Sequence, residues 1–276
     1  MNEPIRPEDY LEPRCPLDCG PSSGAQIQSI PQQRVIEKLD EYLNKRDYAG
    51  AERHLLYWRE EARQGNDLRG QLLVCNELVG HYRKNEQREK AFAAGKEAIG
   101  LLDSLGFSDN LSAGTTYLNI ATAYSAFGED EEALRLFSRA KAVYEALPDT
   151  GPELLGGLYN NMGICCAALG QYSKAQELYA LAMDKMMAVP GSQPEQAITC
   201  LNMADALDAE QGRAAVEAGI RQLLEQARHL LLNAGAEENG YYAFVCEKCA
   251  AGFQDYGDRE TAERLRELAE QIYERT

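Results

Sequence analysis

The chain has 276 residues, of which 45% are hydrophobic, and its 44 acidic and 28 basic side chains give a formal net charge of −16. This hydrophobic fraction is typical of a folded protein and excludes a globally disordered chain. The negative charge repels the phosphates of nucleic acids and anionic membranes, so we expect neutral to basic partners, neither nucleic acid nor membrane. No run of eighteen apolar residues is present, and no membrane span is expected.

Residues 1–31 differ from the rest of the chain, because six of the ten prolines lie there. Proline fixes φ and lacks a backbone donor, so this segment is predicted to be an extended leader. It carries acids and prolines where a signal peptide needs bases and an apolar run, which favours a cytoplasmic location. Two interpretations stay open: the leader covers the first repeat as a cap, or it occupies part of a binding groove.

The remainder, residues 32–276, shows helical periodicity and a repeat at a fixed spacing. Two of the repeating columns, each spaced by 42 residues, are Gly128, Gly170 and Gly212, and Ala91, Ala133 and Ala175. Several independent columns with one period are the signature of a repeat architecture.

Each repeat is predicted to be two antiparallel helices. In the repeat 109–150, Gly128 ends the first helix in the left-handed conformation. Ala133 and Ala140, seven residues apart, let the second helix approach the first closely. The sequence therefore predicts an all-α protein of about six helical hairpins. Their approximate spans are 32–66, 67–108, 109–150, 151–192, 193–236 and 237–276.

The motifs resemble those of the tetratricopeptide-repeat family. A large residue, Leu-(Gly/Ala)-x-x-Tyr, a glycine and Ala-x6-Ala are typical of that family, and related patterns occur in YNNMGICCAALGQYSKAQELYALA and YLNIATAYSAFGEDEEALRLFSRA. The period is longer than the usual 34 residues and is similar to that of kinesin light chains and bacterial peptide-sensing regulators. The resemblance implies a right-handed superhelical solenoid whose first helices line a concave groove. It also implies protein or peptide binding without catalysis.

In such a groove, ligand contacts should cluster near a column of small residues: Val79, Ala121, Gly163, Ala204 and Ala250. Two residues before that column, three successive repeats carry Asn119, Asn161 and Asn202. A carboxamide offers a donor and an acceptor, and can bond the N–H and C=O of one residue in an extended peptide. The full set of residues expected to contact a ligand is Asn76, Arg83, Asn119, Thr122, Asn160, Asn161, Asn202, Asp205 and Asp208.

Alternative interpretations of these residues remain. The asparagines could support helix packing, and the charges could belong to an ordinary solvated face. Asp205 and Asp208 make the C-terminal half acidic, whereas Arg83 makes the second repeat basic. A clamp for acidic C-terminal tails is not expected, because it needs several Lys or Arg beside the asparagines.

No catalytic, cofactor or metal motif stands out. The three histidines, His54, His81 and His229, form no zinc-protease or di-iron pattern. Cys15 with Cys19, and Cys246 with Cys249, could together supply four thiolates for zinc, but helical core packing is favoured for the second pair.

The sequence thus favours a non-catalytic protein- or peptide-binding scaffold. The alternatives are a peptide sensor that acts on a separate effector, and a metal-binding or enzymatic protein. Self-association stays possible, and no cofactor is expected.

Overall fold

A computed structural model describes residues 27–233, 235 and 238–275. Over these residues the chain forms twelve α-helices and no strand, so the predicted all-α class is confirmed. The chain divides into two compact units between Phe127 and Gly128, and each unit is described by itself. No helix in the described part of the chain is both long and apolar enough to cross a membrane.

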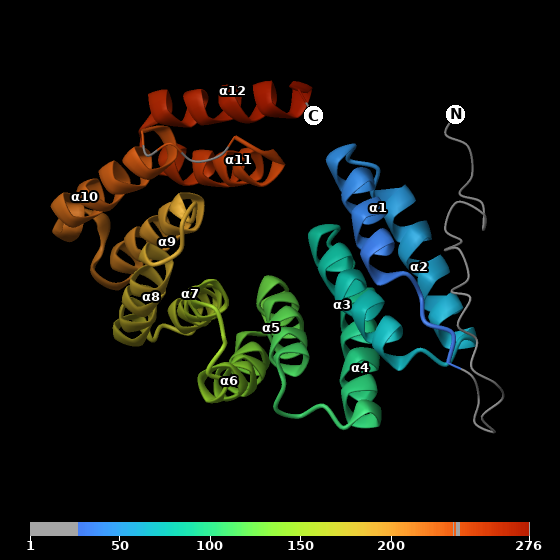
Figure 1. The fold of residues 1–276 in the computed structure, drawn as a ribbon. Helices are drawn as coiled ribbons and strands as arrows, with labels where there is room; N and C mark the ends of the chain where they lie inside the picture. Colours follow the sequence, from blue (N-terminus) through green and yellow to red (C-terminus); the bar gives the residue numbers. More distant parts are fainter. Residues whose placement is uncertain (1–26, 234, 236–237, 276) are drawn as a thin grey trace. The chain divides into compact units, whose positions relative to one another are not determined.

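The first unit contains five helices, coloured blue to green in Figure 1. They are α1 (Gln32–Asn44), α2 (Tyr48–Gln64), α3 (Leu68–Lys84), α4 (Arg88–Leu105) and α5 (Leu111–Ala126). Each helix packs on the next, and α3 also packs on α5. Thus α3 and α5, the first helices of two successive hairpins, lie side by side.

The second unit contains seven helices. They are α6 (Asp130–Ala146), α7 (Pro152–Ala168), α8 (Tyr172–Met187), α9 (Gln193–Gln211), α10 (Arg213–Leu232), α11 (Gly240–Asp255) and α12 (Arg259–Arg275). The pairs α7 with α8, α9 with α10 and α11 with α12 pack most extensively, and α9 also packs on α7 and α11. Helix α10 is kinked at Val216, where φ is −120° and ψ is 16°.

The turns between successive helices explain the glycine column. Gly128 and Gly170 have φ values of +78° and +72°, the left-handed conformation that glycine adopts without a steric cost. The equivalent turn between α3 and α4 carries Glu86, whose φ is +57°. The left-handed turn therefore persists where the sequence column has lost its glycine.

Small residues of the repeat are buried, and one of them lies where α7 and α8 approach each other. Ala133 on α6 and Ala175 on α8 are fully buried. On α7, a Cβ added to Gly163 would lie 2.5 Å from Cε1 of Tyr179 on α8. No side chain fits there without a shift, so glycine allows α7 and α8 to pack closely.

The described residues before α1 contact the turn between α2 and α3. The Gln28 N–H donates to the Gly65 carbonyl at 2.9 Å, and the Ile30 N–H donates to Asp67 Oδ2 at 3.0 Å. Ile30 is buried beside this turn. Residues 1–26 of the expected leader lie outside the described residues, so its extended form and its two interpretations stay predictions.

Candidate binding surfaces

In the first unit, two asparagines and one threonine join α3 to α5. Asn119 Nδ2 donates to Asn76 Oδ1 at 3.3 Å, and Asn76 Nδ2 donates to Thr116 Oγ1 at 2.9 Å. Asn76 also donates to the Leu72 carbonyl at 3.0 Å within its own helix. Both donor hydrogens and the carbonyl of Asn76 are therefore engaged inside the protein.

The second unit repeats this arrangement between α7 and α9. Asn202 Nδ2 donates to Asn160 Oδ1 at 2.9 Å, and the Thr199 hydroxyl lies 3.2 Å from the same oxygen. We name each arrangement an asparagine clasp: Asn76, Thr116 and Asn119 in the first unit, and Asn160, Thr199 and Asn202 in the second. Within each clasp, Asn76 or Asn160 is the inner asparagine, and Asn119 or Asn202 is the outer one.

The outer asparagines keep hydrogen-bonding capacity. Each of Asn119 and Asn202 uses one N–H in its clasp, and the described residues offer no partner for the carbonyl oxygen or the second N–H. Each can therefore still offer one donor and one acceptor to a ligand.

Sequence reasoning missed the two threonines of the clasps. In both units the threonine lies three residues before the outer asparagine, giving Thr-x-x-Asn at 116–119 and 199–202. Residues three apart share a helix face, so this spacing was a usable signal.

Thr122 and Asn161 have internal bonds of their own. The Thr122 hydroxyl donates to the Leu118 carbonyl at 2.8 Å in α5. Asn161 Oδ1 accepts from Asn160 Nδ2 at 3.5 Å in α7. Of the row expected from the sequence, Asn119 belongs to the first unit, whereas Asn161 and Asn202 belong to the second.

The acidic residues expected in the site have partners within the second unit. Asp208 pairs with the Arg213 guanidinium at 2.8 Å, and Asp205 Oδ1 accepts from the Tyr256 hydroxyl at 2.8 Å. The Arg213 guanidinium also lies 4.5 Å from the centre of the Tyr256 ring. Burial raises the pKa of Asp205, and the bond from Tyr256 partly offsets that effect. This network ties the α9–α10 junction to the α11–α12 turn.

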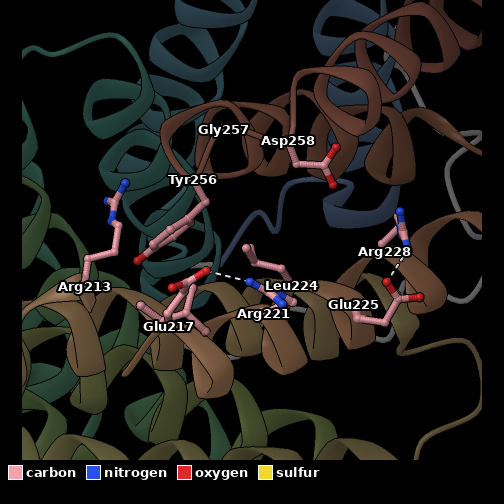
Figure 2. Close-up of a pocket in the computed structure, with 10 residues that line it drawn as sticks. Arg213, Glu217, Arg221, Leu224, Glu225, Arg228, Tyr256, Gly257 and Asp258 are labelled. Carbon is pink, nitrogen blue, oxygen red and sulfur yellow. Dashed lines mark hydrogen bonds and ion pairs between the residues drawn. The ribbon is translucent and has the colours of Figure 1, made fainter. Parts of the chain in front are cut away.

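A surface hollow lies between α10 and the α11–α12 turn, and Figure 2 shows its lining residues. Its guanidinium groups are occupied, because Arg221 pairs with Glu217 and Arg228 pairs with Glu225. None of the asparagines expected in the site lines this hollow. It is connected to the expected site through Arg213, the partner of Asp208, and Tyr256, the partner of Asp205.

The histidines and cysteines have surroundings typical of structural residues. His54 and His81 are buried, and burial lowers the pKa of each imidazole. Cys246 and Cys249 are buried in α11, and burial raises the pKa of the Cys249 thiol to about 12. Cys15 and Cys19 lie outside the described residues. Among the described residues, no three His, Cys, Asp or Glu side chains are grouped as metal ligands would be.

Comparisons with known proteins agree with this fold. Residues 70–146 match the family model described as tetratricopeptide repeat. No curated protein sequence matches the chain closely enough to count as a relative.

Two solved structures are similar over most of this chain. A putative kinesin light chain from Podosopora anserina, with nearly identical TPR-like repeats, is 22% identical, has a TM-score of 0.50, and covers 73% of this chain and 94% of its own. BtubC (BKLC) from P. vanneervenii is 16% identical, has a TM-score of 0.54, and covers 83% of this chain and 90% of its own. At such low identity these likenesses establish the fold alone. Residues 70–146 therefore match tetratricopeptide repeats, and the fold of the chain is similar to that of kinesin-light-chain repeat structures.

Proposed function

We propose that the protein is a non-catalytic binding module that holds extended segments of a partner protein at its two asparagine clasps. The observation that carries this proposal is the outer asparagine of each clasp, which keeps one donor and one acceptor for a ligand. A peptide residue in extended conformation presents one N–H and one C=O, which match that pair.

Open space beside the second clasp supports the same function. Apart from the backbone of α7 itself, no atom in the described part of the chain lies within 4 Å of the position that a Cβ of Gly157 would occupy. Asn160 and Asn161 follow three and four residues later and therefore border this glycine on the helix surface. A ligand backbone can approach the helix there more closely than it could over a side chain.

The test compares outer with inner asparagines. The purified full chain is applied to an array of capped random ten-residue peptides, and affinities for the peptides retained are measured by fluorescence anisotropy. The triple variant Asn119→Ala, Asn161→Ala and Asn202→Ala should weaken binding at least about tenfold, since each lost hydrogen bond contributes about 0.5–1.5 kcal/mol.

The matched control is the double variant Asn76→Ala and Asn160→Ala. It breaks both clasps but keeps the outer amides, so it should lower the melting temperature while weakening binding less than the triple variant does. Equal losses in the two variants would mean that the asparagines act only on stability. An array that retains no peptide at all would contradict the proposed function.

A further inference from the structure

Gly80 leaves an open patch in the middle of α3. Outside its own helix backbone, no atom of the described residues lies within 4 Å of the position that its Cβ would occupy. Glycine is less favourable than alanine inside a helix. At Gly163, close helix packing explains the glycine, but none of the described residues packs over Gly80. The helix backbone at Gly80 is therefore open to an approaching molecule.

Polar side chains surround this patch on the helix surface. The residues three and four positions away from Gly80 are Asn76, Glu77, Arg83 and Lys84. Such residues are its neighbours on a helix face. Asn76 is the inner asparagine of the first clasp, so the patch lies next to Asn119 and belongs to the surface of the proposed function.

Arg83 and Lys84 lack an ion-pair partner. Arg83 is half-buried, yet within the described part of the chain neither cation has a hydrogen bond or an ion pair from its side chain. Desolvation by the surrounding protein lowers the pKa of Arg83. Desolvation also lowers the pKa of Lys84, and the neighbouring charge of Arg83 lowers it further. The charges of Glu77 and Asp40 act on Lys84, whereas burial alone shifts the pKa of Arg83. Because neither cation has a carboxylate at ion-pair distance among the described residues, the two form a local site for an anionic group.

The helix dipole explains only part of this arrangement. Cations in the last turn of a helix are stabilised by its C-terminal partial charge, and Arg83 and Lys84 lie in the last turn of α3. The helix dipole explains why the charged residues at this end of α3 are cations. It does not account for a half-buried guanidinium without a partner, or for an open glycine one turn away.

We propose that Gly80, Arg83 and Lys84 form a subsite that takes one acidic side chain of the extended segment held at the first clasp. This inference rests on the proposed function. Asn76 and Arg83 are seven residues apart, which is about 10 Å along a helix. An extended chain advances about 3.3 Å per residue, so the acidic residue lies about three residues from the one held by Asn119.

The other charges fix the orientation and the character of the ligand. Glu77 borders Gly80 on the side away from Arg83. Burial, and then the charge of Asp40, raise the pKa of Glu77, whereas Lys84 lowers it. A second carboxylate is disfavoured beside these two acids, so a ligand carboxylate is directed to Arg83. Charges beyond about 8 Å are screened at physiological salt, so the net charge of −16 disfavours an acidic ligand as a whole but tolerates one carboxylate here.

The test uses two capped seven-residue peptides of alanine and serine, one with a central glutamate and one with a central glutamine. Each is titrated into the 15N-labelled full chain, with the Gly80 amide as the reporter. The glutamate peptide should bind at least about fivefold more tightly, although the net charge of the protein opposes it. The double variant Arg83→Gln and Lys84→Gln should lose this preference. The matched control, Arg53→Gln and Lys96→Gln, makes the same change in net charge at exposed positions on α2 and α4 and should keep it.

A second variant separates binding from folding. Gly80→Ala should raise the melting temperature, because alanine is the better helix former, and yet weaken the glutamate peptide. Acetate at the same concentration serves as the free-anion arm. The subsite is overturned if acetate shifts the Gly80 resonance as strongly as the glutamate peptide does, or if the two peptides bind equally while Asn119→Ala still weakens both. The second result would leave the proposed function standing. If neither peptide binds and the array also retains none, both proposals fail.

Discussion

His54 makes the stability of the first unit depend on pH. Its side chain is 1% exposed, and Nε2 lies 2.9 Å from the Val35 carbonyl oxygen. Because a carbonyl only accepts, Nε2 carries the hydrogen and the neutral ring fits the site. Burial lowers the pKa of His54 below its ordinary value.

The unfolded chain therefore binds a proton at His54 more readily than the folded chain does. The stabilising contribution is complete above pH about 6.5, the ordinary pKa of histidine, and is lost as the pH falls toward the folded pKa. Urea melts should show a lower free energy of unfolding at pH 5.5 than at pH 7.5. His54→Phe should reduce this difference, although buried His81 will preserve part of it. If the His54→Phe variant shows the same difference in free energy of unfolding between the two pH values, His54 is ruled out as a source of that difference.

Glu86 holds a conformation that suits glycine better. Its φ is +57°, and the left-handed region costs a residue with a Cβ about 1–2 kcal/mol. Replacing Glu86 with glycine removes this cost. Part of the resulting gain in stability is lost, because glycine also makes the unfolded chain more flexible. Glu86→Gly should therefore stabilise the protein by about 0.5–1 kcal/mol in thermal melts. The reciprocal change, Gly128→Ala, should destabilise it by a similar amount, since φ there is +78°. A destabilised Glu86→Gly variant would show that the glutamate side chain has a compensating contact.

Single residues also mark how far the sequence predicts the site. The outer asparagines could be picked from their spacing, because position on a helix face is a local property. The partner of Asp205 could not be picked in this way. Tyr256 lies 51 residues after Asp205 in the sequence, and only packing of α9 beside α11 brings the two together.

At the scale of elements, one aspartate joins a helix cap to the chain before α1. Asp67 Oδ1 accepts from the Gly70 N–H at 2.9 Å and so caps α3, while Oδ2 accepts from the Ile30 N–H at 3.0 Å. Asp47 caps α2 in the same way, by accepting from the Gly50 N–H at 2.8 Å. This capping bond is the only feature that it shares with Asp67.

The two caps form a matched pair for mutation. Asp47→Ala should cost about 1 kcal/mol, the usual value for a lost N-cap. Asp67→Ala should cost about 2 kcal/mol, because it also leaves the buried Ile30 N–H without its acceptor. Chemical denaturation measures both. If the two variants lose the same stability, the bond to Ile30 contributes nothing.

For the whole molecule, the net charge of −16 should govern how fast ligands arrive. The field of an acidic protein attracts cations over distances that salt screens. The association rate of a capped seven-residue peptide with two lysines should fall several-fold between 20 and 300 mM salt, in stopped-flow fluorescence. The same peptide with glutamines in place of the lysines should show a nearly constant rate. A lysine peptide whose rate ignores salt would contradict electrostatic steering.

The sequence by itself determined the all-α class, the helical repeat and the resemblance to tetratricopeptide repeats. These features depend on helical periodicity, on glycine in left-handed turns and on small residues at a fixed spacing, all of which are written within one or two repeats. Only the tertiary structure decided which polar groups are already used. It engages Asn76 and Asn160 in clasps, gives Asp205 and Asp208 internal partners, and leaves Arg83 without one among the described residues. The physical reason is that a hydrogen bond depends on a distance of about 3 Å between side chains that, in the clasps, are some forty residues apart in the sequence.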